Sequence, residues 1–292
     1  MFMALIAAML WGVSGTCGQF LFQQRGVNVE WLMSVRMLGA GTLLLITALL
    51  RKDDHVWAIW HNKEDRRKIL VFGIFGMLAV QYTYFAAIKH SNAATATILQ
   101  FSTPVLIAVY LAVRYNQRLS RLGYVAILLA ILGTFLLVTH GNIHKLNISP
   151  MAFALGIASA VSLAFYTLMP GTLLKKYSSL SVVGWGLFIG GVTISLVKAP
   201  WNADGNWDGY AYASCFFIVI FGTLIPFYLY LRAVQCIGSQ KASLLTSAEP
   251  LSATLVAVSW LGVSFQVMDW LGALLIIATV FLLSAGKISQ EG

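Results

Sequence analysis

The stretch IFGMLAVQYTYFAAIKHSNAATATILQFSTP, residues 74–104, returns later in the chain as IFGTLIPFYLYLRAVQCIGSQKASLLTSAEP, residues 220–250. The two stretches align without a gap at an offset of 146, and ten of the 31 aligned positions are identical. Apolar sequence of low complexity produces chance matches, but identical Tyr, Tyr and Pro residues in register are harder to obtain that way. We therefore interpret the pair as an internal duplication, which indicates a repeat architecture.

The duplication divides the chain into two halves, residues 1–145 and 146–292. Of all residues 59% are hydrophobic and only 10% are charged, and the mean hydropathy is +0.81. Soluble domains carry about 25% charged residues, so this composition indicates a polytopic membrane protein. The net charge of +9 does not indicate nucleic-acid binding, because the charges fall in short gaps between apolar runs.

Ten segments are apolar over about 20 residues, the length that a membrane-spanning helix requires. They are residues 2–22, 31–50, 69–88, 93–113, 119–139, 151–170, 180–198, 211–235, 241–262 and 267–286. Each half holds five spans, and because five is odd the second half enters the membrane in the opposite orientation. The sequence predicts an all-α fold of ten transmembrane helices in two inverted five-helix repeats, as in many secondary transporters. The loop at 51–68 is predicted to hold a short interfacial helix.

Lys and Arg residues are distributed unevenly over the predicted loops. With the N-terminus inside, 13 of the 19 lie in the inner loops and the C-terminus, four lie in the outer loops, and two lie within spans. This asymmetry favours a multi-pass protein of the cell membrane with both termini in the cytoplasm. The basic cytoplasmic loops are then expected to contact anionic lipid.

Four motifs follow one another along the chain: LWGVSG at residues 10–15, SVRMLGAG at residues 34–41, and the runs Ala96–Pro104 and Ala242–Pro250. Their order and the duplication resemble the drug/metabolite transporter (DMT) superfamily, and most closely its EamA-type transporters. The resemblance covers the whole chain and implies two five-helix repeats around a central cavity. It also implies secondary transport, mostly export of amino acids or related metabolites. The motif Ala248–Pro250 is similar to that of amino-acid exporters, whereas nucleotide sugars, organic phosphates and organic cations or drugs stay open as alternative substrates.

Glu249 is the one acidic residue of the ten that lies deep within a predicted span, about eight residues from its start. A charge at that depth costs about 2.5–3.5 kcal/mol, so the carboxylate is expected to face water, meet a partner or take up a proton. One interpretation is a site for a substrate ammonium group or for a coupled proton. The other is a fixed hydrogen-bond or ion-pair partner that ties helices together.

Arg36 lies inside the second predicted span. Its planar guanidinium suits a substrate carboxylate or phosphate, although it could also bind helix carbonyls or extend to the interface. Pro104 and Pro250 occupy equivalent places in the two halves, where each removes a helix hydrogen bond. Paired prolines near the midplane indicate a kink or gate beside a substrate site, or alternatively simple packing kinks.

Five further side chains within the spans are candidate walls of a substrate cavity: Trp11, Tyr84, Gln100, Thr103 and Tyr230. Aromatic faces suit amino-acid or cationic ligands, but in most helices they serve core packing. The amide and the hydroxyl either line the cavity or bond across helices.

The sequence indicates no enzyme, cofactor or metal site. It has no paired acids, HExxH motif, Ser/His couple or P-loop, and the three cysteines in apolar runs lack metal-ligand spacing. A small polar metabolite is the expected partner besides lipid. A membrane scaffold or lipid-handling protein is the non-transport alternative, and monomer and homodimer both stay open.

Overall fold

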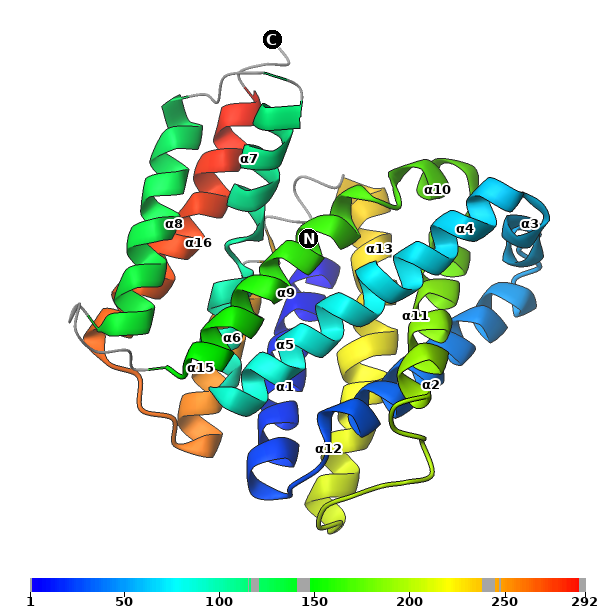
Figure 1. Ribbon diagram of the computed structural model, residues 1–292, viewed down its shortest axis with the longest axis horizontal. Coiled ribbons are helices and arrows are strands. Elements are labelled where there is room, and N and C mark those ends of the chain that lie inside the picture. Colours follow the sequence, from blue (N-terminus) through cyan, green and yellow to red (C-terminus); the bar gives the residue numbers. More distant parts are fainter. Residues whose placement is uncertain are drawn as a thin grey trace.

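The computed structural model describes residues 2–114, 116, 121–140, 148–237, 245–246 and 248–288, and all regular secondary structure within them is helical (Figure 1). The predicted all-α class is thereby confirmed. In chain order the elements are α1 (Phe2–Gln24), α2 (Val29–Leu50), α3 (His55–His61), α4 (Lys63–Val71), η1 (Phe72–Leu78), α5 (Ala79–His90), α6 (Ala93–Gln100), α7 (Thr103–Arg114), α8 (Arg121–Thr139), α9 (Pro150–Leu168), α10 (Gly171–Lys176), α11 (Ser179–Ser195), α12 (Gly209–Val219), η2 (Ile220–Leu224), α13 (Ile225–Ile237), α15 (Ala248–Leu261) and α16 (Val267–Ile288).

Seven helical segments in this part of the chain are long and apolar enough to cross a bilayer. Three shorter apolar helices accompany them, over Ser179–Ser195, Ala248–Leu261 and Val267–Leu282. Each of these segments overlaps one of the predicted spans. The predicted ninth span, residues 241–262, begins outside the described residues, and its described helix α15 has 14 residues. The predicted short helix between the second and third spans is α3.

Both repeat prolines lie near helix starts rather than inside continuous helices. The predicted span 93–113 consists of α6 and α7, which are separated by a turn at Phe101 and Ser102. Pro104 is the second residue of α7, and Pro250 is the third residue of α15. The role of these prolines as kinks or gates stays a prediction, and the structure places both in the first turn of a helix. Proline is tolerated in the first turn because the N–H that it lacks would have no helical partner there.

A π-helical segment occurs in each half, and both segments contain the repeated sequence Ile-Phe-Gly. η1 joins α4 to α5, and η2 joins α12 to α13. In η2 the hydroxyl of Thr223 donates to the carbonyl of Ile218, five residues earlier, over 2.9 Å. π-Helical segments are rare, and those that occur are often found at functional sites. Because η1 and η2 occupy equivalent positions of the two repeats, this region of the bundle is a candidate functional site.

Glycines allow the backbones of two helix pairs to approach closely. A Cβ at Gly41 of α2 would lie 2.6 Å from the backbone nitrogen of Phe188 in α11, and one at Gly191 would lie 2.7 Å from that of Leu38. The two helices are therefore antiparallel. α8 and α16 meet in the same manner, because a Cβ at Gly133 would lie 2.7 Å from the carbonyl oxygen of Gly272. Small residues at such crossings are typical of helix packing in membranes.

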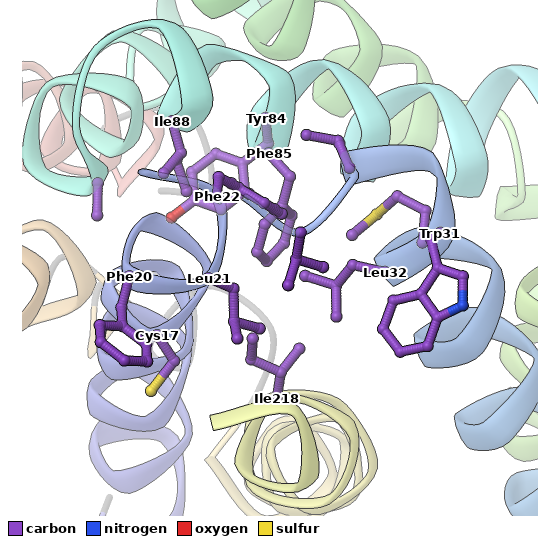
Figure 2. Packing of buried hydrophobic residues seen from close by; sticks show 14 of the residues in the cluster. Cys17, Phe20, Leu21, Phe22, Trp31, Leu32, Tyr84, Phe85, Ile88 and Ile218 are labelled. Carbon is purple, nitrogen blue, oxygen red and sulfur yellow. The ribbon is translucent and has the colours of Figure 1, made fainter. Parts of the chain in front are cut away.

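The largest hydrophobic cluster joins α1, α2, α5 and α12. Figure 2 shows Leu21 of α1, Leu32 of α2, Phe85 of α5 and Ile218 of α12 converging on one core. These four side chains are at most 1% exposed. Tyr84 points from α5 toward α1 at the edge of this core (Figure 2), so the cluster fixes the helices that carry the polar residues described below.

A polar network around Asp53 joins the loop before α3 to the start of α11. Asp53 accepts hydrogen bonds from the hydroxyls of Ser178 and Ser181 and from the backbone N–H of His55. The ring of His55 also contacts its carboxylate, at 2.9 Å. Burial acts to raise the pKa of Asp53, but these hydrogen bonds outweigh it and hold the pKa below its usual range.

Asp53→Asn is expected to lower the thermal stability of the purified protein, and the loss should depend on pH. A carboxyl whose pKa is depressed on folding stabilises the protein above its unfolded pKa, and this stabilisation disappears as the pH falls through the folded pKa. The difference in Tm between wild type and variant should thus be constant from about pH 5 to 7 and shrink below about pH 4. A difference in Tm that grows on acidification would contradict this assignment.

Candidate functional site

Arg36 of α2 is buried at the π-helical segment η2. Its Nε donates to the hydroxyl of Thr223 over 2.7 Å, and its Nη2 donates to the carbonyl of Gly222 over 3.3 Å. The guanidinium lies over the ring of Phe85, 4.6 Å from the ring centroid. With 5% of its surface exposed, Arg36 is held inside the bundle rather than extended to an interface.

Glu249 of α15 and Tyr84 of α5 lie near enough to Arg36 for the three groups to interact electrostatically. The hydroxyl of Tyr84 shares a 2.8 Å hydrogen bond with the hydroxyl of Thr97. Three of the predicted site residues, from three helices, therefore lie within electrostatic reach of one another. A charged group within a membrane requires polar neighbours of this kind.

Glu249 is the second residue of the described helix α15. Most of the predicted span before it, residues 241–244 and 247, lies outside the described residues. The backbone N–H of Glu249 donates to the carbonyl of Thr246 over 2.9 Å, and its own carbonyl accepts from the hydroxyl of Ser252 at the same distance. A carboxylate in the first turn is stabilised by the positive end of the helix dipole, typically by about 0.3–1 kcal/mol.

Trp11 and Tyr230 form an aromatic group with Phe227. The ring of Trp11 in α1 lies 5.6 Å from that of Tyr230 and 5.5 Å from that of Phe227, both in α13. Tyr166 of α9 lies within electrostatic reach of Tyr230 and stacks on another ring, Phe72. The structure thus brings Trp11 and Tyr230 together, with a further aromatic side chain from α9 that the sequence did not single out.

Gln100 and Thr103 have partners on a neighbouring helix. The amide nitrogen of Gln100 donates to the hydroxyl of Ser159 over 2.6 Å, and the hydroxyl of Thr103 lies 3.1 Å from the carbonyl of Ala160. Thr103 also donates to the carbonyl of Gln100 over 2.6 Å, across the turn between α6 and α7. These contacts favour the alternative in which both side chains bond across helices.

Three residues around Arg36 were not predicted from the sequence. Gly222 and Thr223 supply its two acceptors, and Ser14 of α1 packs so closely on Gly222 that a Cβ there would collide with it. Isolated hydroxyls and glycines are common in apolar helices. The only signal for this group was that Gly222 matches Gly76 in the duplicated stretch.

The meeting point of these helices is closed from solvent in this conformation, since Arg36 and Tyr84 are 5% and 7% exposed. A shallow groove of about 210 Å³ lies elsewhere, between residues near the start of α2 and those before and within α12. None of the predicted site residues lines it. Its walls are Trp31, Ala203, Trp207, Tyr212, Cys215 and Phe216.

Membrane-length apolar helices that enclose a buried arginine and a glutamate define a polytopic membrane protein with a polar centre. The sequence profile of the EamA-like transporter family matches residues 1–139 and 150–285. The chain belongs to this family, which is a branch of the DMT superfamily, and it is a membrane transporter.

Curated relatives carry transporter names. The uncharacterized inner membrane transporter YicL of Salmonella typhimurium is 43% identical over 96% of this chain and 93% of its own length. The uncharacterized transporter YwfM of Bacillus subtilis is 24% identical over 98% of this chain and 94% of its own. The threonine/homoserine exporter RhtA of Salmonella typhimurium is 22% identical over 82% of this chain and 77% of its own.

A solved crystal structure has a similar fold. Its chain is 17% identical in sequence and superposes with a TM-score of 0.65, over 100% of this chain and 98% of its own. At this level of identity the likeness concerns the fold alone.

Proposed function

We propose that this transporter exports amino acids or related small polar metabolites by alternating access. The observation that carries the proposal is the electrostatic proximity of Arg36, Tyr84 and Glu249 from α2, α5 and α15. An amino acid presents a carboxylate and an ammonium group, and neighbouring opposite charges inside a bundle are suited to bind both. The distant relatives named threonine/homoserine exporters support the same substrate class.

The proposed cycle uses two inverted five-helix repeats, residues 1–145 and 146–292, with the substrate cavity between them. The family profile matches the chain in two ranges of similar length, which supports a duplication. The π segments and the proline-containing helix starts recur in both halves. α2 and α11 cross antiparallel, as do α8 and α16. A two-fold axis in the membrane plane requires equivalent helices that cross it to be antiparallel.

Within this cavity Arg36 is assigned to the substrate carboxylate and Glu249 to the ammonium group. Tyr84 forms a polar wall between them, and Trp11 with Tyr230 forms an aromatic wall that suits an apolar or cationic part of the substrate. The helix starts at Pro104 and Pro250 are the points at which each half bends during the cycle. Both termini are placed in the cytoplasm, with basic loops on anionic lipid of the cell membrane.

Counterflow in proteoliposomes tests the proposal. Vesicles that hold the purified protein and an unlabelled compound are diluted into the labelled compound, and uptake is followed for amino acids, organic cations, nucleotide sugars and organic phosphates. Uptake of labelled amino acids, absent from protein-free vesicles, is expected. Exchange of one other class alone would assign that class instead. No exchange by protein with a cooperative unfolding transition would favour a scaffold or lipid-handling role.

A further inference from the structure

Two buried hydrogen-bond donors meet at Gly222 without a partner of their own. Within the described residues, Nη1 of Arg36 donates no hydrogen bond, and neither does the hydroxyl of Ser14. Ser14 is 1% exposed and Arg36 is 5% exposed. Nη2 of Arg36 binds the carbonyl of Gly222, and the side chain of Ser14 occupies the space where a Cβ of that glycine would stand. Unpaired buried donors are rare in folded proteins, so each one requires an explanation, and a bound acceptor group is one of them.

We propose that Nη1 of Arg36 and the hydroxyl of Ser14 form a subsite for a single carboxylate group, so that the substrate is a carboxylate-bearing metabolite. This inference rests on the proposed function, which it narrows. It adds Ser14 as a substrate-binding residue, and it excludes phosphate esters and simple organic cations as the preferred substrates.

The two unpaired donors, Nη1 of Arg36 and the hydroxyl of Ser14, match the two oxygens of a carboxylate in number. A carboxylate has one negative charge and two oxygens, and it commonly accepts one bond at each from an arginine and a second donor. A phosphate ester carries about −1.5 to −2 charges and three strong acceptor oxygens. Two free donors satisfy too few of those oxygens.

η2 orients the arginine. The hydroxyl of Thr223 accepts a hydrogen bond from Nε of Arg36, and the carbonyl of Gly222 accepts one from Nη2. The ring of Phe85 covers one face of the guanidinium. These contacts leave Nη1 as the free end of a rigid fork. The π turn makes this possible because the hydroxyl of Thr223 donates to the carbonyl of Ile218 and so presents its lone pairs to Arg36. Thr223 is accordingly a positioning residue.

The test is ligand-dependent thermal unfolding of the full-length protein in detergent, with propionate as probe and with isosteric propionamide and chloride as controls at equal concentration and ionic strength. Propionate is expected to raise Tm of the wild type by about 2 °C or more, because a ligand bound only by the folded state stabilises it. Propionamide and chloride should raise it by less than half as much. Ser14→Ala should remove most of the propionate effect without a large change in the Tm of the free protein.

Ser34→Ala is the matched control. Ser34 is an equally buried serine whose hydroxyl donates to the carbonyl of Trp31 over 2.8 Å, so its loss should leave the propionate effect unchanged. Thr223→Val should weaken the effect, and Thr223→Ser should restore it. Equal shifts from propionate and propionamide, or a full effect in Ser14→Ala, would overturn the subsite.

Counterflow separates this inference from the proposed function. If propionate selectively stabilises the protein but the protein exchanges no metabolite, the carboxylate subsite is supported and the proposed export function is rejected. Exchange of L-amino acids and of their amides at equal rates would retain transport and reject the carboxylate subsite. Exchange that falls at least tenfold when the acid is replaced by its amide, and that loses this preference in Ser14→Ala, is the expected result.

Discussion

Replacing Glu249 with glutamine is expected to reduce the rate of amino-acid exchange by about 30- to 150-fold. The substitution keeps the shape of the side chain but removes the ionisable carboxyl group that interacts electrostatically with Arg36. Truncation of one partner of a buried charge pair costs about 2–5 kcal/mol, and the lower part of that range, about 2–3 kcal/mol, corresponds to this loss of rate. The measurement is counterflow in proteoliposomes, with Tm of the same preparation determined in parallel.

Glu30→Gln is the matched control for charge. Glu30 lies in the first turn of α2 and accepts a hydrogen bond from the hydroxyl of Tyr82 over 2.9 Å, away from the central residues. The exchange rate of the Glu30→Gln variant should stay within a factor of about two of the wild-type rate. If Glu249→Gln instead lowers exchange and Tm together, Glu249 serves to tie helices, and the assignment of the ammonium site fails. Unchanged exchange would remove it from the mechanism altogether.

The membrane class and the helical segments could be predicted because the bilayer fixes both composition and length. Hydrocarbon about 30 Å thick requires about 20 apolar residues per helix, and charges are confined to the gaps between them. The duplicated stretch added a second constraint, since residues at equivalent positions of two repeats are under the same structural demands. The π segments η1 and η2 occur where the repeated Ile-Phe-Gly predicts equivalence, although the sequence itself contains no signal for π geometry.

The starts of α7 and α15 could not be predicted from the sequence. An amphipathic helix shows its boundaries through periodicity, but α6, α7 and α15 consist mostly of small and apolar residues. Proline alone is ambiguous, since it either kinks a helix or begins one. The choice at Pro104 and Pro250 depends on which backbone carbonyls find partners after folding. For this reason the first-turn positions of Pro104, Pro250 and Glu249 were not evident from the sequence.

The partners of Arg36 were equally hidden in the sequence. Its hydrogen bond to Thr223 joins residues 187 positions apart, and it depends on how α2 crosses η2. A hydroxyl in an apolar helix most often donates a hydrogen bond to a carbonyl of its own helix, as the hydroxyl of Thr47 does to the carbonyl of Leu43. Only the folded structure distinguishes that common arrangement from Ser14, whose hydroxyl finds no partner in the described part of the chain. The charged and aromatic side chains of the site were therefore named from the sequence, whereas Ser14, Gly222 and Thr223 were not.

Gly12→Ala is expected to lower both the stability and the exchange rate, although alanine is the better helix former. Gly12 lies where α1 crosses α15, and a Cβ there would stand 2.7 Å from the backbone nitrogen of Ala253 and from the carbonyl oxygen of Glu249. Backbone atoms cannot rotate away as a side chain can, so α15 must shift. Overpacking of this kind costs about 1–3 kcal/mol, against a gain of about 1 kcal/mol from helix propensity.

The matched control is Gly171→Ala, at the first residue of the short helix α10, where an added Cβ meets nothing within 4 Å. That change should leave Tm equal to or above the wild-type value and exchange unchanged. Gly12→Ala should lower Tm by several degrees, and at a temperature well below Tm it should still reduce exchange at least tenfold. The two effects separate because a shift of α15 moves Glu249 relative to Arg36 even in molecules that remain folded. A displacement of 1 Å in a binding site is enough to reduce the rate by about a hundredfold. Normal exchange by folded Gly12→Ala protein would therefore show that substrate transport does not depend on where α15 holds the carboxyl group of Glu249.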